Sequence, residues 1–271
     1  MKKGTGSDRR KTLYTIWLIV TIALLPIRAY LQQLPPKEVI HFTQFWTSIN
    51  ANARISDKWS ILADFHMRRN SFLKEPGFYL IRTGAAYRLR PNVAVAAGYA
   101  HLWSAGEKIG GKYFFLNENR VYEQAILTHP AGKINMLHRI RNEQRWIEYT
   151  VNNTPSGEFR FTNRVRYLLS LRIPLSDNPK YPQLVLADEI MLHFGKAVTH
   201  SNFEQNRIFA GFNQPISKSL SFDIGYMYIY QLRINGYQYN ASNVLRLFFY
   251  YNPYWRKQKH DHAIANNHGD D

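Results

Sequence analysis

The sequence predicts an all-β fold, namely a transmembrane antiparallel up-and-down β-barrel of about 10–12 strands preceded by a signal peptide. Three observations predict it: a basic and then apolar amino-terminal segment, stretches that alternate apolar with polar residues, and links that alternate between short and long. No sustained helical periodicity follows the first segment. We expect a signal peptide at 1–29, an outer-membrane barrel at 30–254 and a polar periplasmic tail at 255–271.

The amino-terminal segment has the layout of a secretory signal peptide. Five basic residues precede an apolar run at 13–25, namely Lys2, Lys3, Arg9, Arg10 and Lys11. The run is shorter than the ~20 residues that a membrane-spanning helix needs, and a small residue, Ala29, follows it. We expect cleavage near Ala29, with a retained signal anchor as the alternative.

Cysteine content and charge narrow the class of protein. The chain has no cysteine, which excludes disulfides, a lipid-modified amino-terminal cysteine, thiolate metal sites and cysteine nucleophiles. The formal net charge is +16; six Lys/Arg and one Asp within 1–29 supply +5 of it, so +11 remains on the mature chain. A positive net charge this large favours binding either to nucleic acid or to an anionic lipopolysaccharide surface.

The alternation of residue types indicates strands with one apolar and one polar face. In 59–68, Ile61 and Phe65 share a face, whereas Asp64 and Arg68 share the other. The same pattern recurs in 159–173, 220–232 and 241–251, and it is the repeating signature of a membrane barrel. A soluble β-sandwich is the alternative, but its inner face would have to bury these charges.

Counting the alternating segments gives eleven strands. They begin near Phe42, Trp59, Phe78, Val93, Asn117, Ile134, Phe159, Gln183, Glu204, Leu220 and Tyr239. Single-chain bacterial barrels have an even number of strands, so we expect either a further strand within 31–41 or one segment that is not part of the barrel. Long links at 71–77, 104–116, 150–158 and 195–203 are expected outside the cell, and shorter turns in the periplasm.

Charged residues on the inward faces predict an Arg/Glu-lined lumen. In the run 138–146, alternate residues project to the same side of one strand. The predicted network, which is also the candidate anion-binding site, comprises Glu118, Arg120, Arg139, Arg141, Glu143, Arg145, Arg164, Arg166, Arg172, Glu189, Arg207 and Arg246. Either these groups interlock as a plug of charge-assisted hydrogen bonds, or surplus arginines attract anions into a wet pore. The plug is favoured because side chains nearly fill a barrel of this size.

The run 138–146, the pairs Asn119-Arg120 and Asn206-Arg207, and Glu189 resemble a bacterial outer-membrane family catalogued as domain of unknown function 2490. The similarity covers about 46–251. This resemblance implies a barrel and supplies no activity, because the family itself is uncharacterised.

Catalytic and metal chemistry are weakly supported. His138 and His101 are placed on strands without a Gly-x-Ser-x-Gly elbow, so we interpret them as interfacial side chains and expect no catalytic residues. The tail carries His260, His262 and His268, but an unstructured segment rarely preorganises ligands, so no metal site and no cofactor are expected.

Three functions remain in view. The first is an outer-membrane barrel with a structural or accessory role, the second an anion-preferring diffusion channel, and the third a lipid-modifying enzyme, which the missing nucleophile disfavours. The expected partners are outer-membrane lipid, lipopolysaccharide and, during biogenesis, the barrel-assembly machinery. Nucleic acid is not expected, because the arginines alternate inward on strands and the chain is predicted to be exported from a Gram-negative cytoplasm.

Overall fold

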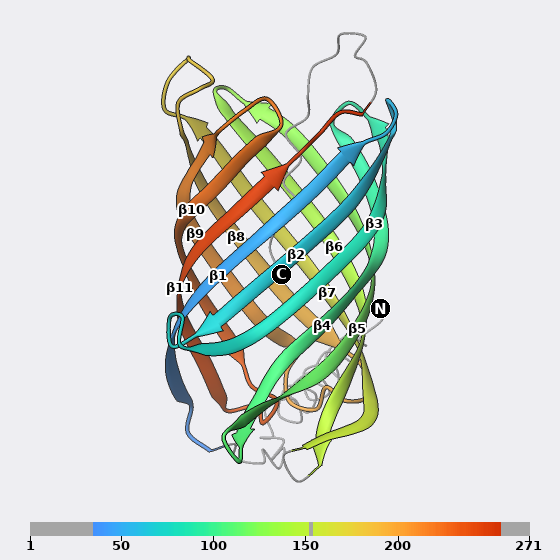
Figure 1. Ribbon diagram of the computed structural model, residues 1–271, viewed down its shortest axis with the longest axis vertical. Coiled ribbons are helices and arrows are strands. Elements are labelled where there is room, and N and C mark those ends of the chain that lie inside the picture. Colours follow the sequence, from blue (N-terminus) through green and yellow to red (C-terminus); the bar gives the residue numbers. More distant parts are fainter. Residues whose placement is uncertain (1–34, 152–153, 256–271) are drawn as a thin grey trace, which may run out of the picture. The chain divides into compact units, whose positions relative to one another are not determined.

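The chain forms a closed β-barrel of eleven strands (Figure 1). The computed structural model describes residues 35–151 and 154–255. Contacts divide the chain into one unit, Met1–Pro36, and a second, Lys37–Asp271, which contains the barrel. The predicted signal peptide and nearly all of the predicted tail lie outside the described residues. In the described ranges, no helix has the length and apolar character needed to cross a membrane.

All eleven predicted segments are strands of the barrel, so the predicted range of 10–12 strands is confirmed. Their bounds are β1 Glu38–Arg54, β2 Trp59–Asn70, β3 Glu75–Arg90, β4 Val93–Ile109, β5 Lys112–Ala131, β6 Ile134–Val151, β7 Thr154–Pro174, β8 Gln183–Phe194, β9 Phe203–Pro215, β10 Leu220–Leu232 and β11 Gln238–Tyr251. Each strand pairs with its neighbours in chain order, and β1 closes the ring against β11.

The closure corrects two expectations, an even strand number and a purely antiparallel sheet. Because the described barrel has eleven strands, its first and last strands run in the same direction, and β1 pairs with β11 in parallel register from Glu38 opposite Gln238 to Ala51 opposite Tyr251. The other ten pairings are antiparallel, so the sheet is mixed. The segment 31–41 adds no separate strand in the described part, since its residues from Glu38 onward begin β1.

Two of the predicted long links are largely strand. Residues 104–116 continue the β4–β5 hairpin up to a tight turn at Gly110 and Gly111, whose φ angles are +56° and +84°. Glycine adopts this left-handed region without a Cβ clash, which permits the tight turn. Residues 150–158 belong mostly to β6 and β7. Polar composition suggested links in both places, but backbone pairing continues through them.

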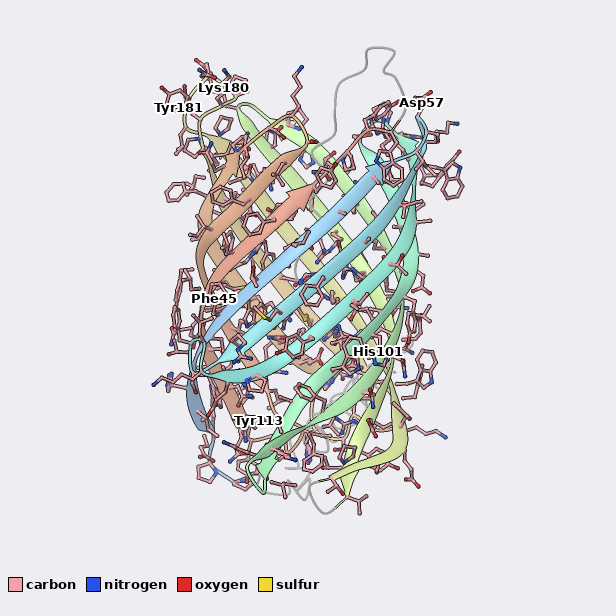
Figure 2. All side chains as sticks on the ribbon, in the orientation of Figure 1. Phe45, Asp57, His101, Tyr113, Lys180 and Tyr181 are labelled. Carbon is pink, nitrogen blue, oxygen red and sulfur yellow. The ribbon has the colours of Figure 1, made fainter. Side chains whose placement is uncertain are left out.

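The remaining links define two rims, which we name after residues labelled in Figure 2. The Asp57 rim carries the links 55–58, 91–92, 132–133, 175–182 and 216–219. The Tyr113 rim carries 71–74, 110–111, 195–202 and 233–237, together with the start of β1. The expected contrast between short and long links is weak, since the link at 175–182 on the Asp57 rim is as long as the one at 195–202.

The alternation of residue types sorts side chains to the two faces of the wall. On β2, Ile61 and Phe65 are more than two-fifths exposed, whereas Asp64 and His66 are buried. On β10, Ile224 is exposed and Asp223 is buried. Successive side chains in a strand point to opposite faces, so the polar face of each alternating stretch lies inside the barrel.

The lumen also contains apolar packing. One cluster joins Trp46 of β1 to residues of β8–β11, including Phe209, Met227 and Phe248. Across the lumen, Gly84 of β3 and Gly98 of β4 lie against the Tyr122 hydroxyl, and a Cβ at either position would collide with it. Small residues on these two strands therefore make room for large inward side chains on β5.

Candidate functional site: the Arg/Glu network of the lumen

The structure places all twelve predicted network residues on the inward face of their strands. Eleven are buried, and the side chain of Arg172 is 12% exposed. They come from β5 to β9 and from β11, because these strands carry charged residues at alternate inward positions. Two of the arginines, Arg139 and Arg166, have no accessible surface.

The centre of the network is two glutamates bridged by one arginine. Arg166 donates from Nη1 to Glu143 Oε1 and from Nε to Glu189 Oε1, both at 2.9 Å. Arg139 Nη2 also donates to Glu189, at 2.7 Å. Arg164 Nε donates to the other oxygen of Glu143 at 2.7 Å. Each carboxylate is therefore shared between at least two guanidinium groups, which is the charge-assisted arrangement that stabilises buried ions best.

A second pair of glutamates extends the network toward the Tyr113 rim. Arg145 donates to Glu118 from Nε and to Glu204 from Nη1, both at 2.6 Å. Arg120 Nε donates to the same Glu118 oxygen at 2.7 Å. Arg164 joins the two halves, since its Nη1 lies 3.4 Å from Glu204 Oε2 while its Nε is bound to Glu143.

The result is one connected network across the lumen from β5 to β9. Its members are Arg120, Glu118, Arg145, Glu204, Arg164, Glu143, Arg141, Arg166, Glu189, Arg139 and Arg207. Seven guanidinium groups face four carboxylates, a surplus of three positive charges. The network thus neutralises most of its own charge while keeping a positive field.

Two of the predicted residues belong to a separate cluster near the Asp57 rim. Arg246 and Arg172 lie 3.3 and 3.6 Å from the carboxylate of Asp223. Tyr250 Oη donates to Asp223 at 3.2 Å, and Asn213 donates to it at 2.6 Å. One carboxylate thus contacts two guanidiniums and two neutral donors, so polar groups also pack together at this end of the lumen.

Sequence reasoning missed Glu204, which binds two arginines of the network. Strict alternation assigns Glu204 to the outward face, because Arg207, three residues further on, points inward. In the β8–β9 pairing, Met191 lies opposite Gln205 and Leu192 opposite Phe203, so Glu204 is an extra residue at a bulge. Bulges redirect side chains, and both Glu204 and Gln205 are buried as a result.

Aromatic rings hold other inward arginines. The Arg68 guanidinium lies 3.3 Å from the centroid of Trp46 and 3.9 Å from that of Phe78. Arg82 donates to Asp64 at 2.6 Å and lies over the Tyr122 ring. The β2 alternation placed Asp64 and Arg68 inward, but no sequence signal identified their partners on the other strands.

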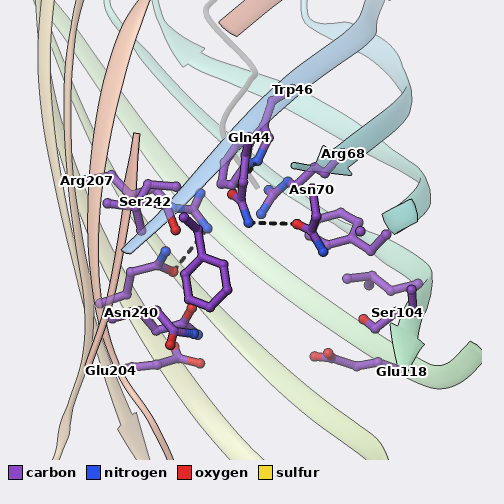
Figure 3. Close-up of a pocket in the computed structure, with 18 of the residues that line it drawn as sticks. Gln44, Trp46, Arg68, Asn70, Ser104, Glu118, Glu204, Arg207, Asn240 and Ser242 are labelled. Carbon is purple, nitrogen blue, oxygen red and sulfur yellow. Dashed lines mark hydrogen bonds between the residues drawn. The ribbon is translucent and has the colours of Figure 1, made fainter. Parts of the chain in front are cut away.

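A cavity of about 460 Å³ occupies the lumen on the Tyr113 side of the network. Figure 3 shows Glu118 and Ser104 on one wall, Glu204 and Asn240 on the opposite wall, and Gln44 bound to Asn70 between them. The wall is mostly polar, and network members form part of it.

His138 and His101 are on the outer surface. His138 stacks on His129 at a centroid distance of 5.2 Å, and its Nδ1 lies 2.8 Å from Tyr167 Oη. His101 Nδ1 lies 2.8 Å from the Asn119 amide oxygen. Among the described residues, no group of three or more His, Cys, Asp or Glu is arranged to hold a metal ion. His260, His262 and His268 lie outside the described residues.

Comparison with known proteins identifies one family. The model of the family described as "Protein of unknown function (DUF2490)" matches residues 43–240, which include β2 to β10 and most of β1. No curated protein and no solved structure matches the chain significantly. Because the family model covers well over half of the sequence, the chain belongs to this family of proteins of unknown function.

Proposed function

We propose that the chain is an integral outer-membrane β-barrel of a Gram-negative bacterium, with a lumen closed by the Arg/Glu network and a structural or accessory role without catalysis. One observation carries the proposal: polarity is inverted relative to a soluble protein. Many buried ion pairs lie inside, beside some apolar clusters, whereas large apolar side chains cover the outside.

The outer face supports membrane insertion. Each of the eleven strands carries at least one large hydrophobic residue that is more than one-third exposed, for example Ile49 on β1, Ile140 on β6 and Ile208 on β9. Soluble monomers rarely expose apolar surface that is continuous around the molecule. A bilayer covers such a surface, and closure of the sheet leaves no unpaired strand edge in lipid.

The remaining features suit the same location. The basic and apolar segment 1–29 favours export, and the positive mature chain suits a surface of anionic lipopolysaccharide. A protein of this type reaches the membrane through the barrel-assembly machinery. The buried ion pairs of the network favour a closed lumen, because several of them would have to break before water could fill the space.

An anion-preferring channel is the second candidate. The surplus of positive charge in the network and the cavity on the Tyr113 side favour it. The two proposals differ in one measurable property, the conductance of the wild-type protein.

Substitution of Ile224 tests membrane insertion. Its side chain is 41% exposed on β10, and an arginine facing hydrocarbon costs about 2–4 kcal/mol. We expect Ile224→Arg to lower the amount of folded protein in the outer-membrane fraction severalfold, with Ile224→Leu as the matched control. Equal yields of the two variants, or wild-type protein in the soluble fraction, would contradict the proposal.

A further inference from the structure

The cavity on the Tyr113 side has a strongly positive wall. Six arginines and two glutamates line it: Arg68, Arg120, Arg145, Arg164, Arg207, Arg233, Glu118 and Glu204. The lining residues carry a surplus of four positive charges, two of which, on Arg164 and Arg207, are also paired with Glu143 and Glu189 outside the lining. The space of about 460 Å³ falls within the range of about 300–1,000 Å³ typical of small-molecule sites. Such a concentration of positive charge in a partly enclosed space attracts an anion carrying more than one negative charge.

The arginines of the wall are held in place before any ligand arrives. Arg145 is fixed by two hydrogen bonds of 2.6 Å to Glu118 and Glu204. Arg68 is stacked between the rings of Trp46 and Phe78, and Arg233 Nε donates to Asn240 at 2.7 Å. Preorganised donors lose little side-chain entropy on binding, so they favour affinity.

Neutral polar side chains line much of the rest of the cavity, beside apolar side chains that include Phe42, Leu102 and Ile229. The polar ones are the side chains of Gln44, Asn70, Ser104, Gln205, Gln231, Asn240 and Ser242, which come from β1, β2, β4, β9, β10 and β11. Amides and hydroxyls both donate and accept hydrogen bonds, so they complement the hydroxyl groups of a sugar. The space itself would hold about fifteen water molecules, enough room for a monosaccharide with some of its hydration.

We propose that this cavity binds a phosphorylated sugar, either as a free sugar phosphate or as the headgroup of a phosphorylated glycolipid. The guanidinium groups bind the phosphate, and the amide wall binds the sugar hydroxyls. Glu118, Arg145, Arg164 and Glu204 of the network form one boundary of the cavity. This inference goes beyond the proposed function and does not depend on where the barrel resides or whether it conducts.

Calorimetric titration of the full-length protein, refolded in detergent, with glucose 6-phosphate tests the proposal. We expect saturable binding that weakens as the salt concentration rises, because exposed parts of the charged wall are screened. Glucose and inorganic phosphate should each bind at least tenfold more weakly, since each offers only half of the recognised chemistry.

Variants locate the binding site. Arg233→Gln, at the mouth of the cavity, and Arg120→Gln should each weaken binding about tenfold. Arg69→Gln is the matched control, because Arg69 donates to the Leu73 carbonyl oxygen on the outer surface of the same rim. Arg233 lies in a link outside the strands, so its variant should fold even where Arg120→Gln does not.

Two ligand presentations distinguish the source of the sugar. Binding of free glucose 6-phosphate supports a soluble ligand, whereas binding only of micelles doped with a phosphorylated glycolipid supports a headgroup. Absence of binding in both presentations at low salt overturns the proposal, as does wild-type affinity in both Arg233→Gln and Arg120→Gln. Inorganic phosphate binding as tightly as the sugar phosphate overturns the assignment to a carbohydrate.

Discussion

The charged side chains buried in this barrel are stabilised by groups of oppositely charged partners. Arg139 and Arg166 have no accessible surface, and removing a guanidinium from water carries a large desolvation cost. Both donate to Glu189, and Arg166 also donates to Glu143. The carboxylates therefore do more than neutralise charge, because each one satisfies several buried donors at once.

Replacement of Glu143 should show this dependence directly. Glu143→Ala leaves Arg164 and Arg166 without one of their carboxylate partners inside the barrel, and breaking a buried pair in this way typically costs about 3–5 kcal/mol. We expect a lower free energy of unfolding in detergent, measured by urea titration. A water-filled lumen would instead solvate the two arginines and leave stability nearly unchanged.

The matched control is Glu123→Ala on the neighbouring strand β5. Glu123 is exposed on the outer face, where it accepts hydrogen bonds from Gln144 Nε2 at 3.1 and 3.2 Å. Its loss should cost about 1 kcal/mol or less. If the two variants are equally stable, the network around Glu143 is not a closed structural unit.

The close approach of β3 and β4 supplies a steric test. A Cβ on Gly98 would lie 2.7 Å from both Gly84 Cα and Tyr122 Oη. Overpacking a filled interior typically costs about 1–3 kcal/mol, so Gly98→Val should lower stability by at least that amount. Ala97→Val, whose side chain points outward from the adjacent position, should be nearly neutral. Urea unfolding of the two variants measures the difference, and equal values would mean that the lumen has spare volume here.

At this scale the sequence predicts which side of the wall a residue occupies but not its partners. Period-two alternation placed Glu143, Arg166 and Glu189 inward, because a strand offers only two faces. Glu204 escaped prediction since a bulge interrupts the alternation, and the pairing of Arg82 with Asp64 depends on register between strands. Register follows from the whole ring and leaves no local mark in the sequence.

Among the elements, the pairing of β1 with β11 is the feature that sequence patterns could not specify. The alternating segments gave the eleven strands, and most predicted starts lie within a few residues of the observed ones. Two apparent loops, 104–116 and 150–158, are mostly strand because hairpin pairing overrides a polar composition. Parallel closure follows from the odd strand number, a property of the ring as a whole.

Cross-linking can verify the parallel pairing of β1 with β11. Because the chain has no native cysteine, only the introduced cysteines can react. Thr47 of β1 lies opposite Leu247 of β11, and neighbouring strands are about 4.8 Å apart, within reach of a disulfide. We expect the Thr47→Cys/Leu247→Cys double variant to form an intramolecular disulfide on mild oxidation, detected by altered electrophoretic mobility that a reductant restores.

A register-shifted pair of cysteines provides the control for the β1–β11 pairing. In Thr47→Cys/Asn243→Cys the two positions are offset by four residues, about 13 Å along the strands. This pair should not cross-link. Efficient cross-linking of the shifted pair, or failure of the aligned pair in folded protein, would show that the barrel closes differently.

For the whole molecule, the charged groups inside the lumen bear on both stability and the passage of ions. A network of seven arginines and four glutamates crosses the lumen between β5 and β9, and the Asp223 cluster lies nearer the Asp57 rim. Trp46, Phe209 and Phe248 pack together in an apolar cluster inside the barrel. In the closed lumen that we propose, these groups form a floor beneath the cavity on the Tyr113 side, and an ion would have to displace that floor to cross the barrel.

Planar-bilayer recording of the wild-type protein measures this directly. We expect negligible conductance, because a passing ion would need several buried ion pairs to separate together, each at a cost of a few kcal/mol. Insertion is checked independently by flotation of the same protein with liposomes. The Arg139→Ala/Arg166→Ala double variant removes two guanidiniums that have no accessible surface, so it should open a water path and conduct. A steady current through the wild-type protein, with the reversal potential of an anion-selective pore in a salt gradient, would contradict the closed lumen. It would favour the channel instead.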